Sequence, residues 1–311
     1  MNHYICTMEK FEVNILGCGS AIPTVRRNPS SQVLNLRDKL YMIDCGEGTQ
    51  VQMRKMKLHL NRLNHIFLSH LHADHCMGLI GLISTMGIVE NGGELVVHAH
   101  PDAERIFRPQ LDYFCSDLPF KVRFNAITPQ KHELIFEDRS LQVYSIPLKH
   151  RVPSCGFLFK EKEKSRHIIP EMTKFHEVPL SFYNHLKAGA DFVKPDGKII
   201  LNKVLTKSPE PARKFAYCSD TAYSEKIVPI IEGVDTLYHE ATFADSEKAR
   251  AKETMHSTAR QAAEIAKKAN VGKLLIGHYS ARYHDLSPLL KEAKSVFDKT
   301  FLVQDGYTFK I

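Results

Sequence analysis

Short apolar runs rich in β-branched and aromatic residues recur along the whole chain, separated by glycine, proline and asparagine. Runs of this length, bounded by turn-forming residues, are typical of β-strands. They predict strands at 11–16, 32–36, 40–43, 65–69, 94–98, 121–127, 141–146, 156–160, 214–218, 236–239, 273–276, 301–303 and 307–310.

One helix is marked by alanines that recur every three or four residues between 258 and 269, the spacing of one helical face. Thr258 with Gln261 fits a capping box at its start, and Asn270 with Gly272 marks its end. A second helix is predicted to begin near Ser287-Pro288, because proline is tolerated in the first helical turn.

The order of these elements indicates an α/β fold. Strands come first and then mix with helices, and no Gly-rich nucleotide-binding loop occurs, which favours two packed sheets flanked by helices. Residues 160–198 do not follow this order of strands and helices. Charges of opposite sign alternate in their first part, and aromatic residues then occur at irregular positions among prolines and polar residues. Such a segment is either a long ordinary connection or a protruding arm, and long insertions are usually functional or flexible.

Bulk composition is that of an ordinary globular protein and argues against a fibrous or disordered one. The 311 residues are 43% hydrophobic and 25% charged, and the formal net charge is +7. That charge is compatible with a nucleic-acid partner, although many proteins without one are equally basic.

Cysteine usage and the absence of targeting signals predict a cytoplasmic protein without membrane contact. Seven cysteines at wide spacing, with no CxxC pair, do not resemble a disulfide framework, so reduced thiols are expected. The first ten residues lack the apolar run of a signal peptide. The longest apolar stretch, 76–89, is shorter than the roughly 20 residues that a membrane helix needs.

The run SHLHADH at 69–75 carries the strongest chemical signal. It places three imidazoles and a carboxylate on one loop directly after a predicted strand. Alternate residues can face one metal while Asp74 and His75 face another. Neutral imidazole and carboxylate suit Zn²⁺, with Mn²⁺ or Fe²⁺ as alternatives. Four ligand-type residues within six positions argue against scattered surface histidines.

Further candidate ligands stand at the ends of other predicted strands. They are His150, Asp220 and His278, which follow the runs that end near 146, 218 and 276. Taken singly, each residue is more often structural, since a lone histidine at a strand end can simply bond the backbone. Their shared position at three strand ends makes them candidates for a common site.

Longer motifs around these residues resemble a known family. The runs LGCGSAIPT at 16–24 and IDCGEGTQ at 43–50, with the histidine cluster, are similar to the metallo-β-lactamase superfamily. Within it, PTVRRN at 23–28, HEAT at 239–242, HST at 256–258 and GHYSARY at 277–283 resemble the ribonuclease Z family. The resemblance spans nearly the whole chain.

This resemblance implies one metallo-β-lactamase-like domain over 1–311, a four-layer αββα sandwich with an exosite arm inserted at 160–198. It also implies two Zn²⁺ ions per chain. The first ion would take His70, His72 and His150, the second would take Asp74, His75 and His278, and Asp220 would bridge them. Such an ion pair activates water and stabilises both the attacking and the leaving oxygen of an in-line displacement.

The implied catalytic residues are Asp74, His256 and Glu240. Asp74 can orient the attacking water and accept its proton. His256 is the implied general acid for the leaving oxygen of the tRNA 3′ end, because imidazole titrates near the working pH. Glu240 would orient that ring and keep it protonated. The alternative for both is a helix-cap role, and His239 is expected only to support the loop.

The implied substrate is precursor tRNA, which loses its 3′ trailer, and the implied assembly is a homodimer in which the arm of one subunit serves the other's active site. Residues 183–189 and 195–198 resemble the second half of the family's arm, whereas 177–182 departs from its Gly-Pro-rich run. Arg282 and Lys187 are candidate substrate-binding residues. The basic residues of 51–64 either line a phosphate path or form one solvated helix face; they are Arg54, Lys55, Lys57 and Arg62.

Other functions stay open at this point. A phosphodiesterase of the same fold that acts on cyclic nucleotides or other small diesters would share the ligands but need no arm. A non-catalytic metal-binding or RNA-binding module has no need of both Asp74 and His256. A β-lactamase or thioesterase would lack the combination of bridging aspartate, HEAT and HST, and the chain has no insertion large enough for a second α/β domain.

Overall fold

The computed structural model describes residues 10–89 and 93–311. They belong to two units, of which the first comprises residues up to 138, 142–159 and 214–311, and the second comprises 139–141 and 160–213. The amino-terminal segment 1–9, in which no signal peptide was expected, lies outside the described residues, as does Cys6. The six described cysteines are free thiols.

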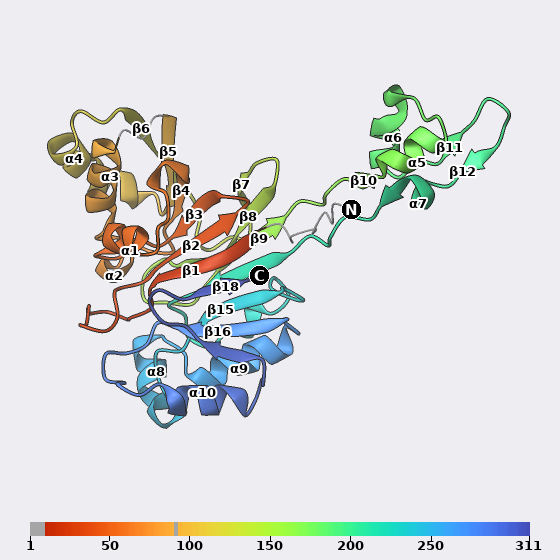
Figure 1. Cartoon of the computed structure of the whole chain (residues 1–311). Coiled ribbons are helices and arrows are strands. Elements are labelled where there is room, and N and C mark those ends of the chain that lie inside the picture. Colours follow the sequence, from red (N-terminus) through yellow and green to blue (C-terminus); the bar gives the residue numbers. More distant parts are fainter. Residues whose placement is uncertain (1–9, 90–92) are drawn as a thin grey trace. The chain divides into compact units, whose positions relative to one another are not determined.

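The first unit contains two seven-stranded sheets (Figure 1). In the first sheet the strands pair antiparallel from β18 to β3 and parallel from β3 to β6. Their spatial order is β18 (Thr308–Lys310), β1 (Phe11–Gly17), β2 (Ser31–Leu36), β3 (Lys39–Ile43), β4 (Leu63–Phe67), β5 (Gly93–Ala99) and β6 (Phe120–Ala126).

The second sheet is parallel from β14 to β17 and antiparallel between β7 and β8. Its spatial order is β17 (Thr300–Leu302), β16 (Lys273–Gly277), β15 (Thr236–Glu240), β14 (Lys214–Cys218), β9 (Cys155–Glu161), β8 (Leu141–Pro147) and β7 (Leu134–Glu137). Parallel strands place their carboxyl ends at one edge of a sheet, and ligands of α/β proteins bind there.

Aromatic side chains join the two sheets. The Phe67 ring of β4 lies 5.5 Å from the Phe157 ring and 5.4 Å from the Phe159 ring, both on β9. All three side chains are fully buried. Such pairs add a directional preference to the burial of apolar area, so they help to set how the sheets face each other.

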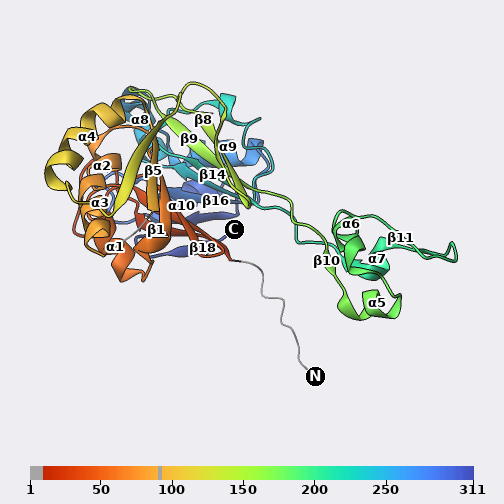
Figure 2. The ribbon, with the colours of Figure 1, turned by 90° about the horizontal axis from the view of Figure 1, so that it is seen from above.

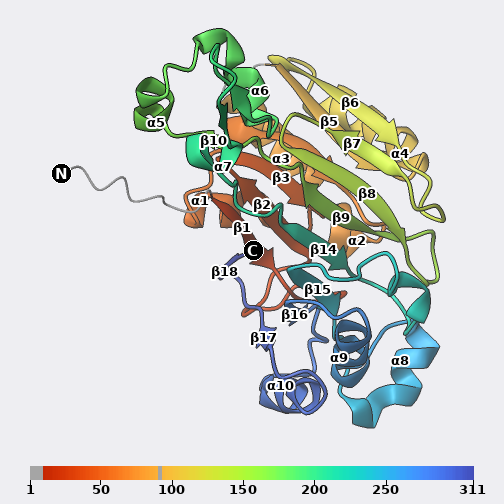
Figure 3. The same ribbon diagram turned by 90° about the vertical axis from the view of Figure 1, so that its right-hand side faces the viewer.

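Helices cover the outer face of each sheet, with α1 to α4 on one side and α8 to α10 on the other (Figures 1 and 3). Their bounds are α1 (Thr49–Lys55), α2 (Ala73–Cys76), α3 (Leu79–Ile88), α4 (Asp102–Phe114), α8 (Lys248–Thr254), α9 (Ala259–Lys268) and α10 (Ser287–Lys294). The capping box of α9 is confirmed, because the Gln261 N–H donates to Thr258 Oγ1 and the Thr258 N–H donates to Gln261 Oε1. The αββα sandwich is confirmed as well.

Each predicted strand is present with its ends within two residues of the prediction, whereas β7, α2, α3, α4, α8 and the helices and strands between 167 and 207 were not predicted. The apolar stretch 76–89 contains the whole of α3, a helix of 10 residues. Among the described residues, no helix is both long and apolar enough to cross a membrane.

The second unit has a small core of its own. Its helices and strands can be followed in Figure 2. Its elements are β10 (His167–Ile168), α5 (Pro170–Phe175), α6 (Tyr183–Lys187), β11 (Phe192–Val193), β12 (Ile199–Ile200), α7 (Asn202–Leu205) and β13 (Thr206–Lys207). Buried apolar side chains fill it, namely Val178, Leu186, Phe192, Ile200 and Leu205. Buried Asn202 donates to the carbonyls of Leu186 (2.9 Å) and Ala190 (2.8 Å), which satisfies backbone groups that no sheet reaches.

An ion pair closes the base of this unit. Arg213 Nε lies 2.9 Å from Glu161 Oε2, Arg213 Nη2 lies 3.1 Å from Oε1, and the Glu161 N–H donates to the Arg213 carbonyl. The side chain of Glu161 is fully buried, so the bidentate pairing compensates for its lost hydration. The unit therefore runs to Arg213, beyond the range 160–198 predicted for the arm. An arm that ended at residue 198 would separate the paired strands β11 and β12.

Candidate active site

Six of the seven candidate ligands lie on segments that follow parallel strands of the two sheets, and His150 follows β8, which pairs antiparallel with β7. His70 follows β4, Asp220 follows β14 and His278 follows β16. Asp220 (φ 38°) and His278 (φ 60°) have left-handed backbone conformations, as has Asp44 (φ 56°) after β3. Non-glycine residues adopt this region at a cost on the order of 1–3 kcal/mol, and such positions concentrate at functional sites.

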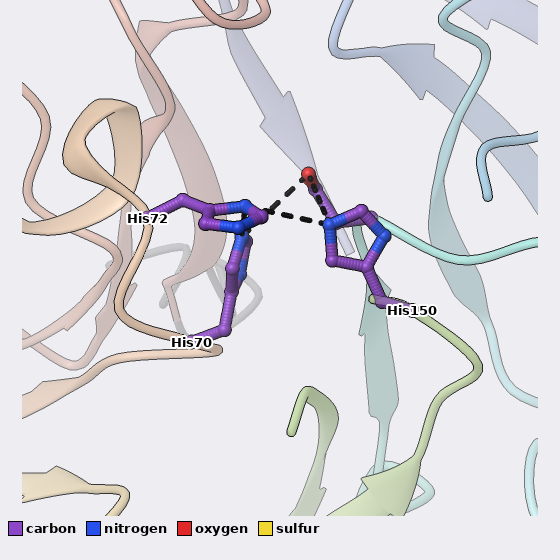
Figure 4. Close-up of side chains that lie close together, drawn as sticks. His70, His72 and His150 are labelled. Atoms are coloured by element: carbon purple, nitrogen blue, oxygen red, sulfur yellow. Dashed lines mark hydrogen bonds and ion pairs between the residues drawn. The ribbon is translucent and has the colours of Figure 1, made fainter. Parts of the chain in front are cut away.

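Three imidazoles and one carboxylate form the first cluster, drawn in Figure 4. His72 Nδ1 lies 3.0 Å from His70 Nε2 and 3.4 Å from His150 Nε2. Asp220 Oδ2 lies 3.6 Å from His70 Nε2 and 3.7 Å from His150 Nε2. One ligand atom from each of these four residues therefore falls within 4.8 Å of all the others.

The second cluster consists of Asp74, His75 and His278, again with ligand atoms within 4.8 Å of one another. His75 Nε2 and His278 Nε2 lie 3.3 Å apart. Asp220 Oδ1 lies 3.1 Å from the first of these nitrogens and 3.0 Å from the second. Asp220 thus turns one oxygen towards each cluster, and the structure brings all seven predicted ligands together.

Four of the five histidines are held from behind by a hydrogen bond at Nδ1, which leaves Nε2 facing the centre. The partners are Ser69 Oγ for His70 (3.0 Å), Asp44 Oδ2 for His75 (2.7 Å), the Met255 carbonyl for His150 (3.1 Å) and Thr242 Oγ1 for His278 (2.9 Å). Metal-binding histidines are held in this way in proteins, because the outer bond selects the tautomer and fixes the ring.

The charge states suit a cation. Burial lowers the pKa of His70, His72 and His150, so these rings stay neutral, which is the form that binds metals. Burial opposes ionisation of Asp220, but His278 and His75 hold the pKa of its carboxyl well below its usual range. Neutral nitrogens only 3.0 Å apart, beside ionised carboxylates, are the donor set of a divalent metal site.

Of the predicted catalytic residues, Asp74 belongs to the second cluster, and His256 and Glu240 lie beside it. Asp74 Oδ2 accepts a 2.7 Å hydrogen bond from the Ala21 N–H. His256 Nδ1 lies 2.9 Å from Glu240 Oε1. Burial alone would lower the pKa of His256, but the Glu240 carboxylate raises it to about 9. The His256 side chain is 15% exposed, so a protonated imidazole is presented at the edge of the site.

The predicted substrate-binding residues are less informative. Arg282 Nη1 pairs with Glu247 Oε2 at 2.9 Å, and its guanidinium lies 5.4 Å from the centre of the Phe243 ring. Lys187 is exposed on α6 of the second unit. Arg62 pairs with Asp38 at 3.2 Å, whereas Arg54, Lys55 and Lys57 are exposed. A role in RNA contact stays a prediction for all of them.

Sequence reasoning did not single out Asp44, which accepts four hydrogen bonds. The donors are the Ser69 N–H (2.7 Å), the Ser69 hydroxyl (2.9 Å), the Tyr217 hydroxyl (2.7 Å) and His75 Nδ1 (2.7 Å). Asp44 thereby links β3, the histidine loop and β14. Its signal in the sequence is an acidic residue directly after the apolar run of β3, the same position that marked Asp220 and His278.

Comparisons with known proteins identify relatives of this chain. The family model described as "Anti-Pycsar protein Apyc1" matches residues 11–185, and the one described as "Beta-lactamase superfamily domain" matches residues 204–279. "Ribonuclease Z" of Parabacteroides distasonis is 60% identical over 98% of this chain and 100% of its own length. "Ribonuclease Z" of Phocaeicola vulgatus is 56% identical, with 98% of each chain covered.

Among solved structures, the short form of human tRNase Z superposes with a TM-score of 0.69 at 24% identity, covering 96% of this chain and 99% of that one. This likeness supports the fold. The sandwich and its histidine–aspartate centre define a hydrolase of the metallo-β-lactamase superfamily. Its full-length identity to curated relatives shows that the chain belongs to the ribonuclease Z family.

We predict that Asp44→Asn weakens metal binding on the order of 10–100-fold and destabilises the metal-free protein by about 1–3 kcal/mol. All four groups that contact Asp44 donate hydrogen bonds to it. The side-chain NH₂ group of asparagine is itself a donor, so in the variant it would face another donor and that hydrogen bond would be lost. The measurements are Zn²⁺ titration against a competing chelator and denaturant unfolding with chelator present. Asp38→Asn, an exposed aspartate with surface ion pairs, is the control. Unchanged affinity and stability in Asp44→Asn would show that the network behind the ligands is dispensable.

Proposed function

We propose that the protein is a zinc-dependent endoribonuclease that removes the 3′ trailer from precursor tRNA and leaves a 3′-hydroxyl on the tRNA. The observation that carries this proposal is the 60% identity to a curated "Ribonuclease Z" along the full length of both chains. The arrangement of the seven ligand candidates supports it, because a phosphodiesterase of this class requires that donor set.

In this proposal His70, His72 and His150 hold one Zn²⁺, Asp74, His75 and His278 hold a second, and Asp220 contacts both; Mn²⁺ or Fe²⁺ are alternatives. When bound, such a pair of ions lowers the pKa of water and offsets the charge that develops on the phosphate. The Ala21 N–H holds the Asp74 carboxylate towards the centre, where it orients the attacking water and takes up its proton.

His256 protonates the leaving 3′ oxygen. Its raised pKa means that the ring carries a proton at neutral pH. Glu240 positions the ring through the 2.9 Å bond to Nδ1, which leaves Nε2 to donate the proton. Glu240 is itself held by the Thr221 N–H at 2.7 Å, so the carboxylate cannot rotate away from the imidazole.

The second unit is proposed to grip the tRNA body. Residues 160–213 contain eleven basic and seven acidic side chains, and none of the ligand candidates. Basic side chains contact phosphates without regard to sequence, and remote binding energy of this kind places the reacting bond over the catalytic groups. The protein is proposed to act as a cytoplasmic homodimer, in which this unit of one subunit serves the partner's site.

Two metal ions per chain are expected after reconstitution with Zn²⁺, since seven ligands exceed what one tetrahedral ion requires. Asp74→Ala is expected to lose part of this metal, whereas His256→Ala keeps all of it. Both variants are expected to lower kcat, by on the order of 10²–10⁴-fold for the general acid. Elemental analysis and single-turnover cleavage of precursor tRNA measure the two effects. A stoichiometry of one with full activity would remove the bridging role of Asp220.

The pH dependence of kcat is expected to report on His256. Activity that needs the protonated ring is present below its pKa and is lost as the pH rises through about 9. Glu240→Gln removes the charge that raises this pKa, so the alkaline limb of the profile is expected to move to lower pH. Glu253→Gln, an exposed site, is the control. An alkaline limb that stays in place in Glu240→Gln would rule out His256 as the acid positioned by Glu240.

Replacing residues 162–212 with a short Gly/Ser linker is expected to cripple cleavage of precursor tRNA while sparing hydrolysis of bis(p-nitrophenyl) phosphate. Glu161 and Arg213 stay in place because their mutual hydrogen bonds bring the two chain ends together for a short linker. The measurements are kcat/KM for both substrates. A milder variant replaces Lys194 and Lys198, at the turn between β11 and β12, with glutamine. It is expected to weaken tRNA binding and reduce its salt dependence.

This replacement also discriminates the alternative function, a phosphodiesterase that acts on cyclic nucleotides or other small diesters. If precursor cleavage survives the replacement undiminished, the tRNA proposal yields to that alternative. If both activities fall in parallel, the second unit is required by the catalytic unit itself.

A further inference from the structure

We propose that Thr242 is a positioning residue that makes His278 a metal ligand and joins it to the His256–Glu240 pair. The inference rests on the proposed function, in which His278 binds metal and Glu240 orients the general acid. Thr242 lies at the end of the HEAT run, two residues after β15, and none of its side-chain contacts reaches the substrate side of the site. Its side chain is almost completely buried.

The Thr242 hydroxyl stands between a carboxylate and an imidazole. Its Oγ1 lies 2.5 Å from Glu240 Oε2 and 2.9 Å from His278 Nδ1. A hydroxyl has one proton to donate, and only one of these two partners can receive it. Both oxygens of Glu240 already accept from backbone donors, Oε1 from the Thr221 N–H (2.7 Å) and Oε2 from the Thr242 N–H (3.3 Å), which is the behaviour of an ionised carboxylate that accepts only. The Thr242 hydroxyl therefore donates its hydrogen bond to Glu240.

The direction of that bond decides the tautomer of His278. Because the Thr242 hydroxyl donates to Glu240, its Oγ1 can only accept from His278, so Nδ1 is the nitrogen that carries a hydrogen. Nε2 then has a free lone pair, and this is the nitrogen 3.0 Å from Asp220 Oδ1 at the centre. With the opposite direction, Nε2 would carry the proton and could not bind a cation.

The other sheet contains the same arrangement. Ser69 Oγ donates to Asp44 Oδ2 at 2.9 Å and lies 3.0 Å from Nδ1 of His70, a ligand candidate of the first cluster. In both places a buried carboxylate orders a hydroxyl, and the hydroxyl orders an imidazole. The recurrence on two unrelated segments supports the assignment for Thr242.

Unlike Asp44, Glu240 also contacts the proposed general acid, His256. Its Oε1 holds His256 while its Oε2 holds Thr242, so one carboxylate serves the general acid through one oxygen and a metal ligand through the other. The hydroxyl of Thr242 therefore affects metal binding, whereas the ring of His256 affects proton transfer. Substitution of each residue separates the two effects.

The test uses Thr242→Val, which keeps the shape and removes the hydroxyl, and Thr242→Ser, which keeps the hydroxyl. Thr236→Val is the matched control, because Thr236 is buried on β15, the strand that precedes Thr242, and its hydroxyl has no hydrogen-bond partner among the described residues. Metal-free proteins are titrated with Zn²⁺ against a chromophoric chelator. Co²⁺ absorption spectra report the coordination of the loaded proteins.

We expect Thr242→Val to lose on the order of 10–100-fold in affinity at one of the two sites and to change the Co²⁺ spectrum. Thr242→Ser and Thr236→Val are expected to match the wild type, and His256→Ala is expected to lose turnover without losing affinity. Wild-type affinity and spectrum in Thr242→Val, with loss in His278→Ala, would overturn the role of Thr242 and leave the metal site standing. Wild-type affinity in His278→Ala would instead overturn the ligand assignment on which the inference rests.

Discussion

Two buried carboxylates, Asp44 behind the first sheet's ligands and Glu240 behind the second's, set the direction of the hydrogen bonds around the centre. A carboxylate accepts hydrogen bonds and does not donate them, so each polar group that contacts it must act as the donor. The Ser69 and Thr242 hydroxyls are ordered in this way, and they stand behind His70 and His278. The geometry of the ligand candidates thus depends on residues that do not face the reaction, and one of these, Asp44, has a left-handed backbone conformation.

These hydrogen bonds can form because the fold brings strand ends from both sheets to one place. Phe67 packs on β9 and Tyr217 reaches across to Asp44, so the two sheets are joined beside the site by apolar packing and by a hydrogen bond. A change in how the sheets pack would move Asp220 relative to His70 and His75. Catalytic geometry and the stability of the sandwich are therefore coupled through the same few side chains.

The sequence predicted what depends on local pattern. Alternating apolar runs located the strands, and the Thr258–Gln261 box located the start of α9. The seven ligand candidates were found because histidine and aspartate at strand ends are unusual. α4 was missed because proline stands within its polar sequence, and α3 because its almost wholly apolar run has no clear helical period. Asp44, Thr242 and the Ala21 N–H could not be assigned, because their roles arise from contacts between segments distant in the chain.

The most direct test of this account is cleavage of a 3′-extended precursor tRNA by the Zn²⁺-loaded protein, with both new ends mapped. We expect a cut at the junction of tRNA body and trailer, a 3′-hydroxyl on the tRNA and a 5′-phosphate on the trailer, since the proposed mechanism has His256 protonate the leaving 3′ oxygen. A 3′-phosphate on the tRNA, or an intact precursor in a preparation that hydrolyses bis(p-nitrophenyl) phosphate, would contradict it.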